Sequence, residues 1–226
     1  MAFRESGRLE YGGVYFVSKQ SLASVFNALR QDLLAPEGAR ISPMRNYRYA
    51  IVPYAPEDEF ELRKQVRKLS DELRAESWNV LEISVQKLLM RRLHGMEERV
   101  LEKLISTEKR QFERNPDKAF QRVKSQVAKL VEGEDGIAAD IIELINDFAD
   151  KHPDQTDNTL IWIKRLGALY PFSRCSTLLK FLDGKTRQLP VVLLYPGTQE
   201  DRTALSFMGE LPADRDYRPR IYEATS

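Results

Sequence analysis

Apolar residues along the chain fall into two patterns, and together these predict an α/β fold. Short runs rich in Val, Ile, Leu and aromatic residues predict buried strands at 47–53, 79–83, 159–163 and 190–195. Between these runs, apolar residues recur three and four positions apart, which indicates helices with one buried face. The order strand, long helix, strand over 47–83 is typical of a βαβ unit with parallel strands and a right-handed crossover.

Helical spacing accounts for most of the remaining chain. The predicted helices are 18–34, 56–76, 85–93, 95–114, 116–132, 137–151 and 176–182. Four of them form a block, at about 85–151, that is inserted between two predicted strands. The run 190–195 is apolar at nearly every position, so it is expected at the centre of the sheet. Segments 205–211 and 218–223 are expected as edge strands or a terminal hairpin.

These elements predict one α/β domain over 18–226, with a central, mostly parallel sheet between layers of helices and an inserted helical block. Residues 1–17 show no sustained period. This segment is interpreted as an N-terminal lead-in, either a natural extension or a partly disordered one. A globule of 226 residues buries about 70% of the surface that its unfolded chain exposes, so it needs no metal or disulfide for stability.

Composition narrows the possible functions. The net charge of +1 gives no global attraction to nucleic acid or to an anionic membrane. Cys175 is the only cysteine, and His94 and His152 are far apart, so a cysteine- or histidine-based metal site is not expected. No run approaches the roughly 18–20 apolar residues of a membrane span. We expect a cytoplasmic protein without a cofactor.

The tripeptide Gly184–Lys185–Thr186 invites comparison with a phosphate-binding loop. Such a loop needs GxxxxGK followed by Ser or Thr, between a strand and a helix, whereas here Leu179 takes the first glycine position and a predicted helix precedes the tripeptide. Gly184 is therefore interpreted as the end of that helix. The chain has no GxGxxG and no HExxH, and Cys175 is interpreted as a small buried residue. We expect that the chain is not an enzyme.

Charge is uneven along the helical block. From Lys87 to Glu132 there are twelve Lys or Arg against seven Asp or Glu, and from Gly133 to Leu160 there are eight acidic residues against one lysine. The cations that would meet phosphates in the basic stretch 87–129 are Arg91, Arg92, Lys109, Arg110, Arg114, Lys118, Arg122 and Lys124. Since glutamates interleave with them and few aromatic residues accompany them, a solvated helix face with i,i+4 ion pairs is the simpler interpretation.

The last third of the chain is rich in aromatic residues and arginine, which interface centres favour. The candidate partner-binding residues are Arg165, Tyr170, Phe172, Arg174, Tyr195, Phe207, Arg218 and Tyr222. Residues of these types also form the ordinary core and rim of a sheet, and the sequence leaves both interpretations open.

Three stretches of this region, taken in order, resemble the BrxB family. They are RLGALYPFSRCSTLLKFLDGKTRQLPVVLLYPG (165–197), LSFMGEL (205–211) and DYRPRIY (216–222). The earlier segments YAIVPYAPEDEFELRKQVRKL and NVLEIS also fit the opening strand, helix and strand of that family, so the resemblance spans roughly 18–222. The chain has Phe207–Met208–Gly209 where the family has a Leu-Phe-Gly-type segment, which is a small departure.

The resemblance implies a part in BREX phage defence, in which host DNA is marked by methylation and phage replication is blocked. It implies a small subunit with no established enzymatic activity, so no catalytic residue is carried over. It also implies association with the PglZ-type alkaline-phosphatase-like component, and through it with the BrxC-type ATPase and the PglX-type methyltransferase. We therefore expect an adaptor that docks on a PglZ-like partner.

Two alternatives stay open beside the adaptor. One is a nucleic-acid-binding module that uses the basic stretch 87–129. The other is an unrecognised hydrolase or nucleotide-binding enzyme with a polar pocket near Tyr54, Ser84, Lys164 and Pro196, where open α/β sheets place ligands.

Overall fold

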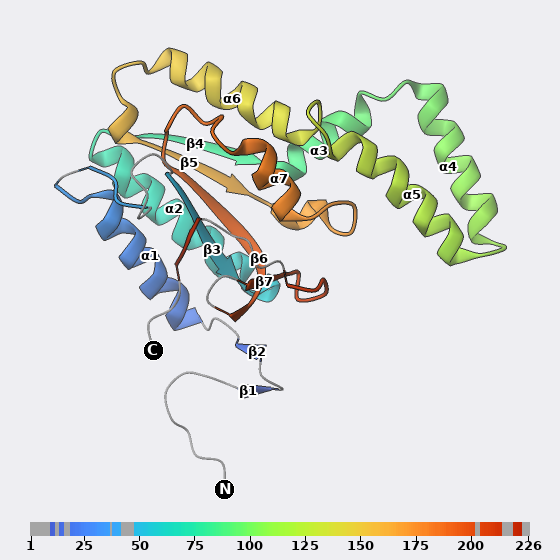
Figure 1. The fold of residues 1–226 in the computed structure, drawn as a ribbon, viewed down its shortest axis with the longest axis horizontal. Coiled ribbons are helices and arrows are strands. Elements are labelled where there is room, and N and C mark those ends of the chain that lie inside the picture. Colours follow the sequence, from blue (N-terminus) through green and yellow to red (C-terminus); the bar gives the residue numbers. More distant parts are fainter. Residues whose placement is uncertain are drawn as a thin grey trace, which may run out of the picture.

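The fold is an α/β arrangement with a mostly parallel sheet between helices, as predicted (Figure 1). The computed structural model describes residues 10–11, 14–15, 19–36, 38–41, 48–201, 204–213 and 219–222. The strands are β1 (Glu10–Tyr11), β2 (Val14–Tyr15), β3 (Tyr49–Tyr54), β4 (Asn79–Ser84), β5 (Thr159–Lys164), β6 (Val191–Asp201), β7 (Ala204–Phe207) and β8 (Arg220–Ile221). The helices are α1 (Lys19–Leu33), α2 (Glu59–Ala75), α3 (Val85–His94), α4 (Glu98–Phe112), α5 (Pro116–Val131), α6 (Ile137–Lys151) and α7 (Cys175–Leu182).

The parallel part of the sheet has the order β4-β5-β6-β3-β8. Asn79 pairs with Thr159 where β4 meets β5, and Tyr49 pairs with Val191 where β3 meets β6. The apolar start of β6 thus lies between two parallel neighbours, which confirms its predicted place at the centre of the sheet.

Beyond its parallel part, β6 continues and pairs antiparallel with β7 and β2. The strand predicted over 205–211 ends at Phe207, because Met208 and Gly209 both take positive φ angles of 59° and 70° in the turn that follows. β8 is a short edge strand that pairs parallel to β3. The expectation of a terminal hairpin or edge strands is therefore met by both, a hairpin at β6–β7 and an edge strand at β8.

Alternation along the strands builds two cores. On β5, Ile161 and Ile163 face the core shared with α3, α6 and α7, whereas Leu160 and Trp162 face the core shared with α1 and α2. All four side chains are buried, since β5 has parallel neighbours on both sides and helices on both faces. Trp162 also donates a 3.0 Å hydrogen bond to Ser70 of α2, which satisfies its indole in the core.

The inserted helical block is confirmed as α3–α6, between β4 and β5. Two of its helices leave the body: α4 and α5 form a hairpin that projects to the right in Figure 1, here called the arm (98–131). Asn115 caps the second helix by accepting a 2.9 Å hydrogen bond from the Lys118 amide, and Pro116 starts it. The side chains of α4 pack chiefly against α5, so the arm is held to the body through α5.

Candidate functional site

The four positions predicted to surround a ligand pocket do meet at one edge of the sheet. Tyr54, Ser84 and Lys164 end β3, β4 and β5, and Pro196 ends the part of β6 that is paired in parallel. Parallel strands place their carboxyl ends together, and this is the edge at which such sheets bind ligands. What the edge can do depends on how its polar groups are engaged.

Tyr54 and Arg165 share one carboxylate at this edge. The Tyr54 hydroxyl donates a 2.6 Å hydrogen bond to Glu59 Oε2, and Arg165 lies 3.1 Å from Glu59 Oε1. Burial, and then the hydrogen bond to Glu59, raise the pKa of Tyr54 well above its ordinary range, so the phenol stays protonated and acts as a donor. The three side chains fasten the start of α2 to the ends of β3 and β5.

Lys164 and Ser84 are engaged in a similar way. Lys164 Nζ lies 2.5 Å from Glu82 Oε2, and Arg74 lies 3.2 Å from the other oxygen of that carboxylate. Burial raises the pKa of Glu82, but the hydrogen bonds and charges of Lys164 and Arg74 outweigh it, and the net pKa is lowered. Ser84 caps α3 by accepting a hydrogen bond from the Lys87 amide. Both predicted pocket residues thus have structural partners within the chain.

Pro196 lies in close packing. A Cβ atom at Gly167 would lie 3.6 Å from Pro196 Cγ and 3.3 Å from Met208 Sδ, so the turn after β7 covers this end of β6. A separate pocket between α6 and α7, lined by Ala138, Leu169 and other residues, has a cavity volume of about 10 Å³. That is room for about one water molecule and is far too small for a substrate.

Three residues predicted to bind a partner are core residues instead. Tyr195, Phe207 and Tyr222 are each at most 3% exposed. The rings of Tyr195 and Phe207 meet edge to face at 5.5 Å, and the Tyr195 hydroxyl donates to the Leu205 carbonyl at 3.2 Å. The prediction was wrong for these residues because strand alternation and close helix packing turn them inward.

Tyr222 is held from the other side of the sheet. Its hydroxyl donates a 2.8 Å hydrogen bond to Asp32 of α1, and Arg220 forms a 2.9 Å ion pair with the same carboxylate. Burial, followed by the bond to Asp32, raises the pKa of Tyr222. These contacts fasten the end of the described chain to α1.

The other predicted partner residues lie close together in the segment between β5 and α7. Arg165, Tyr170, Phe172 and Arg174 are half-buried. Tyr170 and Phe172 pack against the core on the α6–α7 side, and Arg174 donates a 3.2 Å hydrogen bond to the Pro212 carbonyl. These four stay candidates for partner contact, whereas Arg218 lies outside the described residues.

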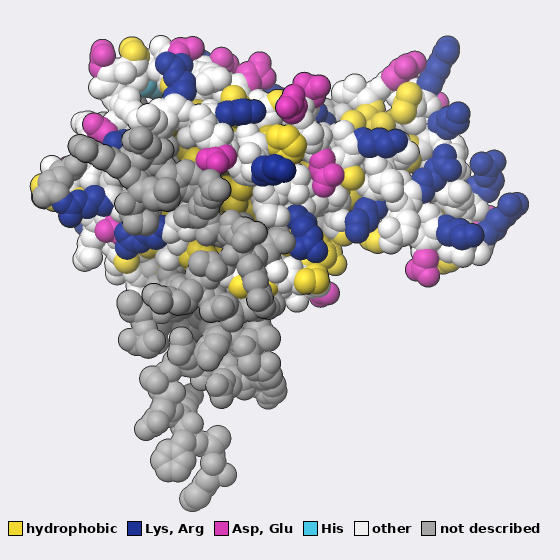
Figure 2. Space-filling view, in the orientation of Figure 1, with side chains coloured by type: hydrophobic (Ala, Val, Ile, Leu, Met, Phe, Trp, Pro, Cys, Tyr) yellow, Lys and Arg dark blue, Asp and Glu magenta, His cyan; other side chains and the backbone are white. Residues whose placement is uncertain are grey.

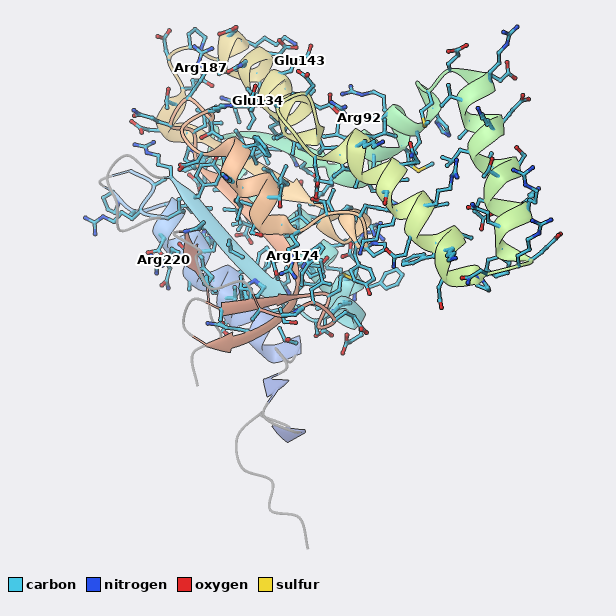
Figure 3. The ribbon with its side chains drawn as sticks, turned by 45° about the vertical axis from the view of Figure 1, so that its right-hand side comes forward. Arg92, Glu134, Glu143, Arg174, Arg187 and Arg220 are labelled. Carbon is cyan, nitrogen blue, oxygen red and sulfur yellow. The ribbon has the colours of Figure 1, made fainter. Side chains whose placement is uncertain are left out.

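Arg92, predicted as a phosphate contact, is engaged within the protein (Figure 3). Its Nε and Nη2 atoms form a two-pronged ion pair with Asp140 at 2.6 and 2.9 Å. The same guanidinium donates to the Leu130 carbonyl at 3.2 Å and the Gly136 carbonyl at 2.7 Å. Arg92 therefore joins α3 to the end of α5 and the start of α6, and it is corrected from a nucleic-acid residue to a structural one.

The remaining basic candidates behave differently from Arg92. Arg91 is exposed and lies 3.5 Å from Asp140. The others lie on the arm: Lys109, Arg110, Arg114, Lys118, Arg122 and Lys124. Within the part of the chain that the structure describes, none of these six forms an ion pair. The face is solvated as the simpler interpretation held, but the expected i,i+4 pairs are not formed.

The same arm carries an apolar surface that was not predicted from the sequence. Of the large hydrophobic side chains that stay exposed among the described residues, most belong to the arm: Val100, Ile105, Phe112 and Phe120. Figure 2 shows Lys and Arg side chains gathered over this projecting end, with apolar side chains among them. The helical spacing of these apolar residues was visible in the sequence, but it predicts a buried face and does not tell which faces find a neighbour.

The remaining motifs carry no further site. Gly184 takes a positive φ of 70° just after α7, which confirms its interpretation as a helix end. Cys175 is fully buried in the core at the start of α7. Among the described residues, no group of three or more His, Cys, Asp and Glu is arranged to hold a metal ion. No helix in the described ranges combines the length and the apolar character needed to cross a membrane.

Comparison with known proteins gives one finding. A family model described as "BREX protein BrxB" matches residues 81–221, from β4 through the helical block to β8. The match leaves out α1, β3 and α2, which the sequence resemblance had included. No curated protein and no solved structure matches the chain.

Proposed function

The chain belongs to the BrxB family and is a component of BREX anti-phage defence, and from this premise we propose that it is a non-catalytic adaptor that docks on the PglZ-like component. Membership of this family implies association with other BREX components. The observation that carries the proposal is the family match itself, which covers the arm and the C-terminal half.

The polar side chains at the carboxyl ends of the parallel strands are engaged with one another, which supports a binding role over a catalytic one. The tyrosine, lysine and arginine side chains at this edge are engaged with Glu59 and Glu82, so they serve the fold. A hydrolase or nucleotide-binding site at the same edge needs polar groups that are free to meet a substrate. The raised pKa of Tyr54 also leaves that phenol without a basic form near neutral pH.

The adaptor proposal predicts a stable complex with the PglZ-like protein of the same BREX system. The two purified proteins are mixed at about 10 μM each and passed over a size-exclusion column, and we expect them to elute together. A dissociation constant of 1 μM corresponds to about −8 kcal/mol, which a standard interface supplies. Separate elution of two folded proteins at this concentration would contradict the proposal.

A pull-down of the tagged protein from its native host at moderate salt, run with and without nuclease, gives the complementary test. Recovery of PglZ-like, BrxC-like or PglX-like proteins supports the adaptor. Recovery that disappears after nuclease treatment would mean that DNA holds the proteins together, and would argue against direct docking.

A further inference from the structure

The arm presents an apolar face that the rest of the described chain leaves uncovered. The face, here called the outer apolar face, consists of Ile105, Phe112 and Phe120, which are 46%, 56% and 50% exposed. Large apolar side chains grouped on a projecting element mark interaction surfaces, whereas single exposed ones are ordinary.

Helix geometry places these three residues on one side of the hairpin. The seam between α4 and α5 contains the buried residues Thr107 and Ala119, together with Gln111, whose side-chain oxygen is buried. Phe112 follows Gln111 by one position and Phe120 follows Ala119 by one position. Because both helices are right-handed and run antiparallel, a step of one position from the seam leads to the same side of the pair. Ile105 lies two turns before Phe112 on that side.

Toward the body, this side of the arm already has neighbours. Val127 and Val131, further along α5, are buried in the core with α3 and α6. The apolar side of α5 is thus covered at its base and open at its outer end. Two packed helices with a shared open apolar side are completed by a third helix laid across them, which is how amphipathic helices dock in grooves.

The charge of the arm indicates which charged residues a partner helix carries. From Lys109 to Lys124 the chain has six Lys or Arg against two acidic residues, Glu113 and Asp117. None of these cations has an ion pair among the described residues, so all six are free to meet carboxylates on a partner. Complementary charge at the rim favours a partner with acidic residues around an apolar centre.

A protein partner fits this surface better than nucleic acid does. Phosphate contacts use cations and polar groups, and they leave an apolar face uncovered. The side chains of the outer apolar face carry no polar group that could contact a phosphate, whereas a protein helix can bury them.

We propose that the outer apolar face and its basic rim bind an acidic amphipathic helix of another component of the BREX assembly. This inference rests on the proposed adaptor function and names the surface that performs it. The arm, rather than the carboxyl edge of the sheet, is the docking element.

Two variants of the full chain test the arm. Phe112→Ser with Phe120→Ser removes the apolar face, and Arg114→Glu with Lys118→Glu reverses the rim. Phe60→Ser is the matched apolar control, because Phe60 is 75% exposed on α2. Arg67→Glu with Lys68→Glu is the matched charge control on the exposed face of the same helix. Circular dichroism of every variant checks the fold, which these exposed positions should leave unchanged.

Affinity for the purified PglZ-like, BrxC-like and PglX-like proteins is measured by calorimetry, and affinity for a labelled 30-base-pair DNA duplex by fluorescence anisotropy. We expect both arm variants to lose at least about tenfold in affinity for one of the proteins, while both controls bind like the wild type. If the wild type binds the PglZ-like protein and the arm variants bind it equally well, the arm inference is overturned and the adaptor function stands. If the wild type binds none of the three, the adaptor function fails and the arm inference fails with it. If the arm variants lose only DNA affinity, the face is a nucleic-acid surface and the inference is overturned.

Discussion

At the scale of single residues, the clearest feature is the number of groups that the Arg92 side chain binds. The Arg92 guanidinium forms two hydrogen bonds to the Asp140 carboxylate, and it also donates to two backbone carbonyls. The planar fork of arginine suits this arrangement, and a lysine would satisfy only part of it. Its neighbour Arg91 has the same charge and the same carboxylate nearby, but it is exposed and 3.5 Å away.

This contrast predicts unequal effects of removing the two arginines. Arg92→Ala leaves Asp140 and two carbonyls without their donor in a poorly hydrated place, so we expect the free energy of unfolding to fall by about 2–4 kcal/mol. Arg91→Ala is the matched control, and it should cost less than about 1 kcal/mol. Urea unfolding followed by circular dichroism measures both. Equal effects of the two substitutions would show that Arg92 is not the structural contact described above.

Residue roles were also the least predictable level from sequence. The helix that carries Arg92 was predicted, but its partner Asp140 lies on another helix, and only the packed fold brings the two together. Tyr195, Phe207 and Tyr222 have the residue types that interfaces favour, and their burial depends on which neighbours cover each strand. The apolar spacing of the arm was present in the sequence, yet its exposure follows from the absence of a covering layer.

At the scale of elements, prediction was far more successful, because spacing and capping are local. The runs that became β3, β4, β5 and β6 were found from apolar residues alone, as were the helices of the inserted block. The exceptions are short elements whose limits are set by turns and pairing. β7 stops at the positive φ angles of Met208 and Gly209, and β8 forms only where the chain reaches the edge of β3.

The arm should be the least protected of these elements. Its outer turns pack against one helix and water, whereas β6 lies between two parallel neighbours with helices on both faces. Native-state hydrogen exchange should therefore show amides of 101–124 exchanging well before those of 191–196. Addition of the partner that binds the arm should slow exchange in the arm. Equal protection of the arm and of β6 in the free chain would contradict this picture of a thinly supported hairpin.

At the scale of the whole molecule, the first helix and the last strand are fastened together. Asp32 of α1 accepts from Tyr222 and pairs with Arg220, which also donates a 3.2 Å hydrogen bond to the Arg40 carbonyl. Arg220 and Tyr222 thus both depend on a carboxylate that lies 190 positions before Tyr222 in the chain. The contact covers the β3 edge of the sheet with β8 and holds α1 against it.

Loss of this carboxylate should weaken the whole fold. Asp32→Ala leaves the buried Tyr222 hydroxyl without its acceptor and removes the ion pair of Arg220, so we expect a loss of about 1–3 kcal/mol in the free energy of unfolding. Glu72→Ala removes the Arg30–Glu72 ion pair, a more exposed contact that α1 makes with α2, and should cost less than about 1 kcal/mol. Thermal melting of both variants compares them. A melting temperature of Asp32→Ala equal to that of Glu72→Ala would show that this fastening contributes little.

The place of β6 in the sheet has a consequence for how the protein is made. β3 is the first of the parallel strands to leave the ribosome, and its central neighbour is made only after the whole helical block. Until then, β3 and β5 each have an open apolar edge, and such edges invite pairing with other chains. The helices of the inserted block have local contacts and form early. They also lie between β3 and β6 in the sequence, so they lengthen the loop that must close when these two strands pair. The nascent chain is therefore most prone to aggregation in the interval before β6 emerges. A chaperone or an already folded partner that covers the open strand edges would have its largest effect in this interval.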